Sequence, residues 1–109
     1  ATTNVGDSWT NLSFGAGWAN YGGGYATCQY RKFGNIVFIK GLAQLKTGTG
    51  DTIGTLPGTH SPTSGQNRIF TIHTSLGVSR VDILSTGAIN VVGGATTTMW
   101  VAINLTFSI

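Results

Sequence analysis

The sequence predicts an all-β protein, an antiparallel β-sandwich of jelly-roll type with about eight short strands. Apolar and polar residues alternate with a period of two along most of the chain, and no segment has the period of a helix. Turn-forming residues separate these alternating segments at short intervals. With 40% hydrophobic residues, the chain of 109 residues has enough apolar surface for the core of one domain.

The first residues of the chain are expected to precede the folded domain. Residues 1–8 are small and polar, which is typical of a linker or the end of an upstream stalk. The chain begins at Ala1 and carries no charged-then-apolar leader, so we expect it to be a piece of a longer protein. The domain itself is predicted over residues 9–109, with a first strand over residues 9–14.

Hairpins and short strands are predicted through the middle of the chain. Alternation over residues 25–31 is interrupted at Gly34-Asn35 and resumes over residues 36–43, which predicts a hairpin, because these turn residues tolerate a positive φ. A long loop rich in Gly, Ser and Thr is expected over residues 58–66. The remaining strands, the last two joined as a hairpin, are predicted over residues 52–56, 68–75, 79–84 and 88–92.

The last eleven residues predict one long strand, over residues 99–109. One face of this strand is expected to point into the core and carries Met99, Val101, Ile103, Leu105, Phe107 and Ile109. The opposite face has mostly small residues and no charge, so we expect the strand to be covered on both sides.

The composition excludes several classes of function. Charged residues make up 8% of the chain, where an ordinary soluble domain has about 25%. A net charge of +3 from six cations and three acids is too sparse for a nucleic-acid partner. No apolar run approaches the roughly 18 residues of a membrane span, so membrane insertion is not expected. A single cysteine, Cys28, excludes an internal disulfide and is expected to be a buried, inert thiol.

The catalytic inventory favours a protein that is not an enzyme. The only acids are Asp7, Asp51 and Asp82, and the only histidines are His60 and His73. No spacing among them marks a pair of catalytic carboxylates or a set of metal ligands. We therefore expect no catalytic residue, no metal and no cofactor.

Several predicted strands have no clear solvent face, which favours an oligomer. Val37, Ile39, Val91, Val92 and Val101 provide more apolar positions than one thin sandwich covers comfortably. A homo-oligomer that buries one sheet against its neighbours accounts for them.

One stretch of the chain resembles a known family. Residues 17–25, Gly-Trp-Ala-Asn-Tyr-Gly-Gly-Gly-Tyr, followed by Gln-Tyr-Arg-Lys at 29–32, resemble the C-terminal head domain of tail-fibre and receptor-binding proteins of tailed bacteriophages, especially those of Gram-positive hosts. The resemblance continues through 37–42, 54–57, 80–83 with 87–89, and 100–107, in the order that the family shows. The sequence departs from the family at 57–62, where related heads usually carry an aromatic and an arginine before the second proline.

The resemblance implies a homotrimeric β-sandwich head at the tip of a phage tail. Such a head is part of the virion, at the tail tip or baseplate, is joined to upstream tail or baseplate proteins and is assembled in the host cytoplasm. It binds a saccharide of the host cell wall, such as a polysaccharide or teichoic acid, without cleaving it. The alternatives are a structural trimerisation cap of a tail fibre and, with less support, a polysaccharide depolymerase module that uses Asp51 and Asp82.

Two groups of residues are candidates for saccharide binding, because sugars stack on aromatic rings and bond planar polar groups. Trp18, Tyr21 and Tyr25 bracket the glycines at 22–24, with Asn20 among them, which predicts a shallow platform. The alternative is that Trp18 and Tyr25 pack in the core at strand ends.

His60 lies in the loop that departs from the family, with Asp51 before the preceding strand and Arg68 after the loop. The alternative for them is three solvated side chains in unrelated turns. Trp100 is expected in an interface or the core, and Asp82 in an ion pair with Arg80.

Overall fold

The computed structural model describes residues 7–109 as twelve β-strands, one short 3₁₀ helix and no α-helix, which confirms the all-β prediction. Every strand pairing is antiparallel. Of the linker predicted over residues 1–8, residues 1–6 lie outside the described part of the chain. No helix among the described residues is long and apolar enough to cross a membrane.

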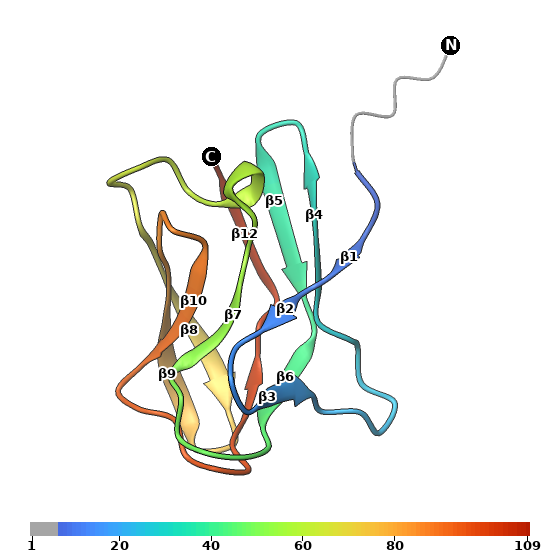
Figure 1. Cartoon of the computed structure of the whole chain (residues 1–109), viewed down its shortest axis with the longest axis vertical. Helices are drawn as coiled ribbons and strands as arrows, with labels where there is room; N and C mark the ends of the chain where they lie inside the picture. The colour runs from blue at the N-terminus through green and yellow to red at the C-terminus, as the bar shows by residue number, and fades with distance from the viewer. Residues whose placement is uncertain (1–6) are drawn as a thin grey trace.

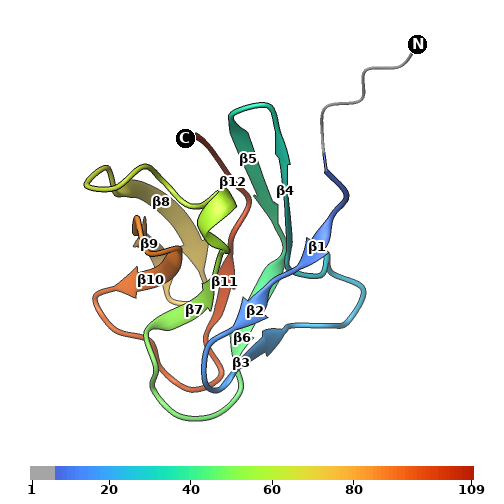
Figure 2. The same ribbon diagram turned by 45° about the horizontal axis from the view of Figure 1, so that its top comes forward.

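The strands form two sheets around a common core (Figures 1 and 2). The larger sheet, of eight strands, is nearly closed into a barrel-like shape. Two sheets around one core agree with the predicted sandwich, whereas its jelly-roll type stays a prediction. The smaller sheet has the order β1 (Thr10–Asn11), β4 (Gln29–Phe33), β5 (Ile36–Lys40) and β12 (Leu105–Ser108). The larger sheet has the order β2 (Ser13–Phe14), β7 (Thr52–Thr55), β10 (Ala88–Val92), β9 (Gly77–Ile83), β8 (Arg68–Thr74), β11 (Trp100–Ala102), β6 (Leu42–Leu45) and β3 (Trp18–Asn20).

The C-terminal segment is divided between the two sheets, so the prediction of one long strand over residues 99–109 is wrong. Its first part is β11 in the larger sheet, and its second part is β12 in the smaller sheet. The division falls at Ile103 and Asn104, where the Ile103 N–H donates to the carbonyl of Gly41 (3.0 Å). Ile103 stays fully buried like Val101 before it, so the alternation of side chains continues through the bend. The pattern of the sequence therefore gave no signal of the division.

Gly41 divides the neighbouring strand in the same way, into β5 and β6. Its φ is +131°, and a Cβ at this position would lie 2.5 Å from the Cα of Cys28, so only glycine fits. A third division, at Leu12, separates β1 from β2, and there the Leu12 N–H donates to the carbonyl of Cys28 (3.0 Å). These adjoining divisions form a corner at which the chain passes from one sheet to the other. They account for three of the four strands beyond the eight predicted, and the fourth is β3, in a stretch for which no strand was predicted.

Two predicted hairpins are confirmed, and a third was not anticipated. β4 and β5 pair up to Phe33 and Ile36, and the turn between them contains Gly34 with a φ of +62°. β9 and β10 pair around the predicted turn at 85–87. β8 and β9 also form a hairpin, which pairs Thr74 with Gly77. The sequence analysis predicted both strands but did not predict that a tight turn joins them.

The buried side chains of both sheets make one hydrophobic core. Cys28 belongs to it, and burial raises the pKa of its thiol to about 12, which agrees with the predicted inert cysteine. The largest completely buried side chains are Leu45, Ile53, Leu56, Ile83, Ile89 and Ile103.

The apolar residues that suggested an oligomer lie mostly in this core. Val37, Ile39, Val91 and Val101 are buried within the single chain, so they need no neighbour to cover them. Other apolar side chains are exposed instead, on the outer face of the β8–β9 hairpin and in its turn. They are Ile69, Leu76 and Val78, each exposed by 63% or more.

Candidate functional site

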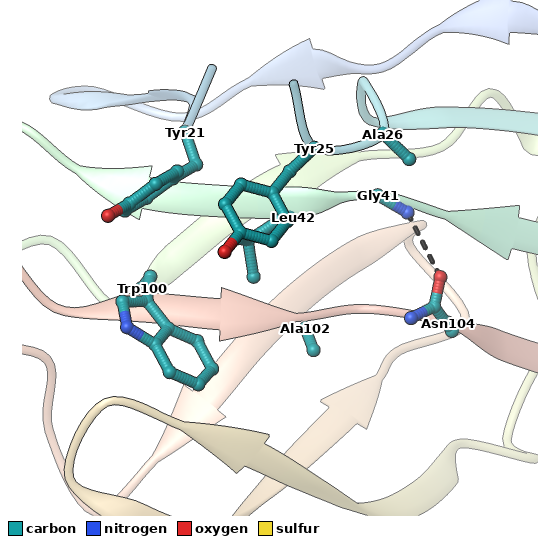
Figure 3. Close-up of a pocket in the computed structure, with 8 residues that line it drawn as sticks. All are labelled: Tyr21, Tyr25, Ala26, Gly41, Leu42, Trp100, Ala102 and Asn104. Carbon is teal, nitrogen blue, oxygen red and sulfur yellow. Dashed lines mark hydrogen bonds between the residues drawn. The ribbon is translucent and has the colours of Figure 1, made fainter. Parts of the chain in front are cut away.

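An open pocket of about 420 Å³ lies on the outer face of β6 and β11, where three aromatic side chains converge (Figure 3). Its volume is in the range of pockets that hold small ligands. We call it the aromatic pocket; it is lined by Tyr21, Tyr25, Ala26, Gly41, Leu42, Trp100, Ala102 and Asn104.

The loop between β3 and β4, residues 21–28, supplies one wall of the aromatic pocket. Gly22, Gly23 and Gly24 all have positive φ, at 83°, 62° and 87°, a conformation that glycine adopts without strain. The loop therefore turns back sharply, and the Tyr25 N–H donates to the carbonyl of Gly22 (3.1 Å). The turn brings the rings of Tyr21 and Tyr25 edge to face, with 5.4 Å between their centroids. The Tyr25 ring is 61% exposed and so presents a face to solvent.

The floor and far wall of the aromatic pocket come from β6 and β11. Ala102 pairs with Leu42 across the two strands, and Trp100 lies two residues before Ala102 on the same outer face. Val101 between them points into the core. Because Ala102 and Gly41 have little or no side chain, the space between Trp100 and the tyrosines stays open (Figure 3).

Asn104 adds a planar polar group at the end of the aromatic pocket nearest the corner. Its Oδ1 accepts a hydrogen bond from the Gly41 N–H (3.2 Å), which fixes the orientation of the amide. The amide Nδ2 lies on the side toward Ala102, away from the bond to Gly41 (Figure 3). Neither a carboxylate nor a histidine lines this pocket among the described residues. The lining is thus aromatic and neutral, which suits stacking and hydrogen bonding and offers no proton donor or acceptor of carboxylate type.

Of the predicted platform, Tyr21 and Tyr25 line the pocket, and Trp18 and Asn20 do not. Trp18 is 5% exposed and belongs to the core, and its Nε1–H donates to the carbonyl of Gly50 (2.8 Å). The Oδ1 of Asn20 accepts from the N–H of Cys28 (2.7 Å) and so ties together the two ends of the loop. Trp18 and Asn20 therefore support the loop that carries Tyr21.

The second predicted group is not brought together. Asp51 lies before β7, and its Oδ1 accepts from the N–H of Ala95 (3.0 Å). His60 ends the 3₁₀ helix η1 (Gly58–His60), beyond the other end of β7. Arg68 donates to the carbonyl of Ser108 (2.8 Å) and to that of Gln66. Each of these three side chains is used in a separate local contact.

His60 is instead part of a hydrogen-bonded row that we call the Asp7–His60 clamp (Asp7, Lys32, Thr59 and His60). The two ring nitrogens of His60 contact Thr59 Oγ1 (2.8 Å) and Asp7 Oδ2 (2.6 Å). The N–H of Lys32 donates to Asp7 Oδ1 (2.6 Å), and this bond is the main reason why the pKa of Asp7 lies below its ordinary value. The Lys32 ammonium also donates to the carbonyl of Thr59 (2.8 Å).

A hydroxyl, an imidazole and a carboxylate in a row are also the parts of a nucleophilic relay. Here, however, Thr59 and Asp7 connect η1 to the start of the folded chain, and none of the clamp residues lines the aromatic pocket. The clamp accordingly has the features of a structural contact. Among residues 7–109, no group of three or more His, Cys, Asp or Glu side chains could hold a metal ion.

Sequence reasoning missed two of the aromatic or polar residues that line the aromatic pocket, Trp100 and Asn104. Trp100 was expected in an interface or the core, but its neighbours Met99 and Val101 take the inward positions. A large aromatic residue on the outward face of a strand was the available signal. Asn104 had no such signal, since its position depends on the corner.

Comparison with known proteins gives one structural match. No family model and no curated protein sequence matches the chain. Among solved structures, the receptor binding protein (gp15) of Listeria phage PSA has a similar fold, with a TM-score of 0.73 and 20% sequence identity. The match covers 92% of this chain and 63% of that chain, so this chain spans less than two thirds of its length. The predicted resemblance to phage receptor-binding heads is thereby confirmed at the level of the fold.

Proposed function

We propose that this domain is the receptor-binding head of a bacteriophage tail and that its aromatic pocket binds a saccharide of the host cell wall. The fold shared with a phage receptor binding protein supports the role in attachment. The observation that carries the ligand class is the convergence of Tyr21, Tyr25 and Trp100 around an open, neutral pocket. In the virion the head lies at the tail tip or baseplate, attached to upstream tail or baseplate proteins.

The chemistry of the lining fits a sugar. The C–H face of a pyranose stacks on the exposed ring of Tyr25 or Trp100, because that face is apolar and the ring surface is electron-rich. Sugar hydroxyls bond the Nδ2 of Asn104 and the phenol groups of the tyrosines. Asn104 is held in place by its bond to Gly41, so this contact requires little ordering on binding.

We propose that binding occurs without cleavage of the saccharide. Hydrolysis of a glycosidic bond needs two carboxyl groups that flank it. Asp82 instead forms two hydrogen bonds with the guanidinium of Arg80 (2.8 and 2.9 Å), as predicted, and Asp51 accepts from Ala95. This internal use of both acids argues against the depolymerase alternative.

A test of this proposal measures binding of the purified domain to Gram-positive cell-wall sacculi in a sedimentation assay. We expect Trp100→Ala and Tyr25→Ala to weaken binding by about tenfold or more, as for aromatic residues at the centre of an interface. Leu76→Ala, which removes an exposed apolar side chain in the turn of the β8–β9 hairpin, serves as the control and should bind normally. A reducing-end assay on the same sacculi should detect no cleavage.

The structural trimerisation cap is the second candidate, and the exposed Ile69 and Val78 on the outer face of β8 and β9 favour it. These two side chains lie on one face of the hairpin, on either side of the Thr71–Arg80 pair, and exposed apolar side chains of this kind are suited to contact between copies in a homotrimer. We expect light scattering to show a trimer that Ile69→Ser with Val78→Ser weakens. If the aromatic variants bind sacculi normally while this double variant dissociates the trimer, the cap is the better description.

A further inference from the structure

A second groove, on the outer face of the smaller sheet, gathers two cations over one indole ring. It has a volume of about 370 Å³ and is lined by Trp9, Arg31, Phe33 and Phe38; we call it the Trp9 groove. The guanidinium carbon of Arg31 lies 5.7 Å from the centroid of the Trp9 ring. The ammonium of Lys40 lies 4.3 Å from the same centroid.

The register of β4 and β5 explains why these side chains meet. Arg31 pairs with Phe38, and Gln29 pairs with Lys40, so Arg31 and Lys40 are diagonal neighbours on one face of the strand pair. Phe33 lies two residues beyond Arg31 on that face and is 49% exposed. The opposite face, with Val37 and Ile39, is in the core.

The two cations have no anionic partner in this arrangement. Among the described residues, neither Arg31 nor Lys40 forms an ion pair, and the Nε of Arg31 is inaccessible to solvent without a hydrogen-bond partner. Asp7 is near enough for Arg31 to help lower its pKa, but both of its oxygens are bonded, to Lys32 and His60. Two like charges near one ring repel each other, while the ring attracts each of them.

We propose that the Trp9 groove is a second ligand-binding site, one that takes an anionic group, phosphate or carboxylate, attached to a sugar or another small ring. The anion lies between Arg31 and Lys40 and relieves their repulsion, while the attached ring rests on Phe33 and Phe38. A guanidinium binds an oxyanion through two parallel hydrogen bonds, which is stronger than a contact between neutral groups. The site does not depend on the aromatic pocket, since the two share no lining residue.

The two sites nevertheless occupy one outer surface. Phe38, Lys40 and Leu42 are successive outward positions of β5 and β6, and Leu42 lies in the aromatic pocket. Four residues of extended chain span at most about 14 Å, so the groove and the pocket are close neighbours across the corner at Gly41. A single polymer can therefore reach both.

Nuclear magnetic resonance of the three indole N–H groups tests the proposal on the purified domain. The chain contains only Trp9, Trp18 and Trp100, and Trp9→Phe assigns the first resonance. Probes are glucose 1-phosphate, glucuronate and the neutral methyl glucoside. We expect the two anionic probes, but not the neutral one, to shift the Trp9 resonance saturably, and added salt to weaken the effect. Comparison of the two anions distinguishes a phosphate site from a carboxylate site.

Charge variants provide the matched comparison. Arg31→Gln and Lys40→Gln should each weaken the affinity for the anionic probe about tenfold, because each removes a charge-assisted contact. Lys46→Gln makes the same change of charge at an exposed lysine outside the groove and should bind as the unmodified domain does. The resonances of Trp18 in the core should stay in place in all three variants if they are folded.

Four outcomes would overturn the inference. One is a Trp9 shift of equal size with methyl glucoside, and another is an equal loss of affinity in Lys46→Gln. The third is a Trp9 resonance that responds to protein concentration and not to the probes, which would make the groove a contact between copies of the chain. A shift of Trp100 alone would support the aromatic pocket and reject the groove, so the two proposals fail separately.

Discussion

The aromatic pocket and the Asp7–His60 clamp each bring together side chains able to form hydrogen bonds, but they use them in opposite ways. In the clamp, His60 contacts Thr59 and Asp7 through its two ring nitrogens, and both oxygens of Asp7 are occupied. In the aromatic pocket, Tyr25 exposes 61% of its surface, and Asn104 is the lining residue whose side chain forms a hydrogen bond with another described residue. Groups that are satisfied internally hold the chain together, whereas groups left free are available to a ligand.

The largest effect is expected at the corner, because it supports the pocket and the fold together. A Cβ in Gly41→Ala would lie 2.5 Å from the backbone of Cys28, in a conformation with positive φ. We therefore expect the free energy of unfolding to fall by about 3 kcal/mol or more. Gly22→Ala is the matched control, since its φ is +83° but no atom lies within 4 Å of the added Cβ. It should cost only about 1 kcal/mol. Chemical denaturation of both variants provides the measurement, and equal losses would contradict the role of the corner.

Variants of Tyr21 and His60 test whether the pocket serves binding and the clamp serves stability. We expect Tyr21→Ala to weaken binding to sacculi several-fold with little change in stability, since its ring is in the pocket lining. His60→Ala should instead lower the free energy of unfolding by about 1 kcal/mol and leave binding unchanged, because it removes contacts to Asp7 and Thr59. Binding lost in His60→Ala, with stability kept, would show that the clamp belongs to the receptor site.

The clamp should also make stability depend on pH in the acid range. The N–H of Lys32, followed by His60, holds the pKa of Asp7 below its ordinary value of 3.8. A carboxyl whose pKa is lowered in the folded state stabilises the fold at any pH above the pKa of the unfolded state. This contribution is lost as the pH falls through the pKa of the folded state. Thermal unfolding between pH 7 and pH 2 should therefore show a smaller decrease in Asp7→Asn than in the unmodified domain. Identical decreases would mean that Asp7 makes no such contribution.

The smallest effect is expected from removal of one phenol oxygen. Tyr25→Phe keeps the ring that stacks on a sugar and loses only a hydroxyl, so binding to sacculi should weaken by a few-fold at most. A loss as large as that of Tyr25→Ala would assign the contact to the hydroxyl and not to the ring face. The stability of the domain should stay unchanged, since the ring is mostly exposed.

Prediction from the sequence succeeded where the signal is local. Alternation located most of the strands, and the turn residues located two hairpins, because both depend on neighbours along the chain. Prediction failed at the corner, where the inward positions of residues 99–107 continue without interruption although the strand changes sheets. For the site, Tyr21 and Tyr25 of the predicted platform line the aromatic pocket, whereas Trp18 and Asn20 lie outside its lining, and saccharide binding at this platform stays a prediction.

The sequence by itself determined which side chains point inward and which point outward. That choice follows from the period of two along a strand and from the hydrophobicity of each residue type. Only the tertiary structure decided which outward residues became neighbours. Trp100 meets Tyr21 and Tyr25, and Arg31 meets Lys40 over Trp9, because strand register and the bend at Gly41 place distant segments side by side. Register depends on the pairing of whole strands, which no short window of sequence contains.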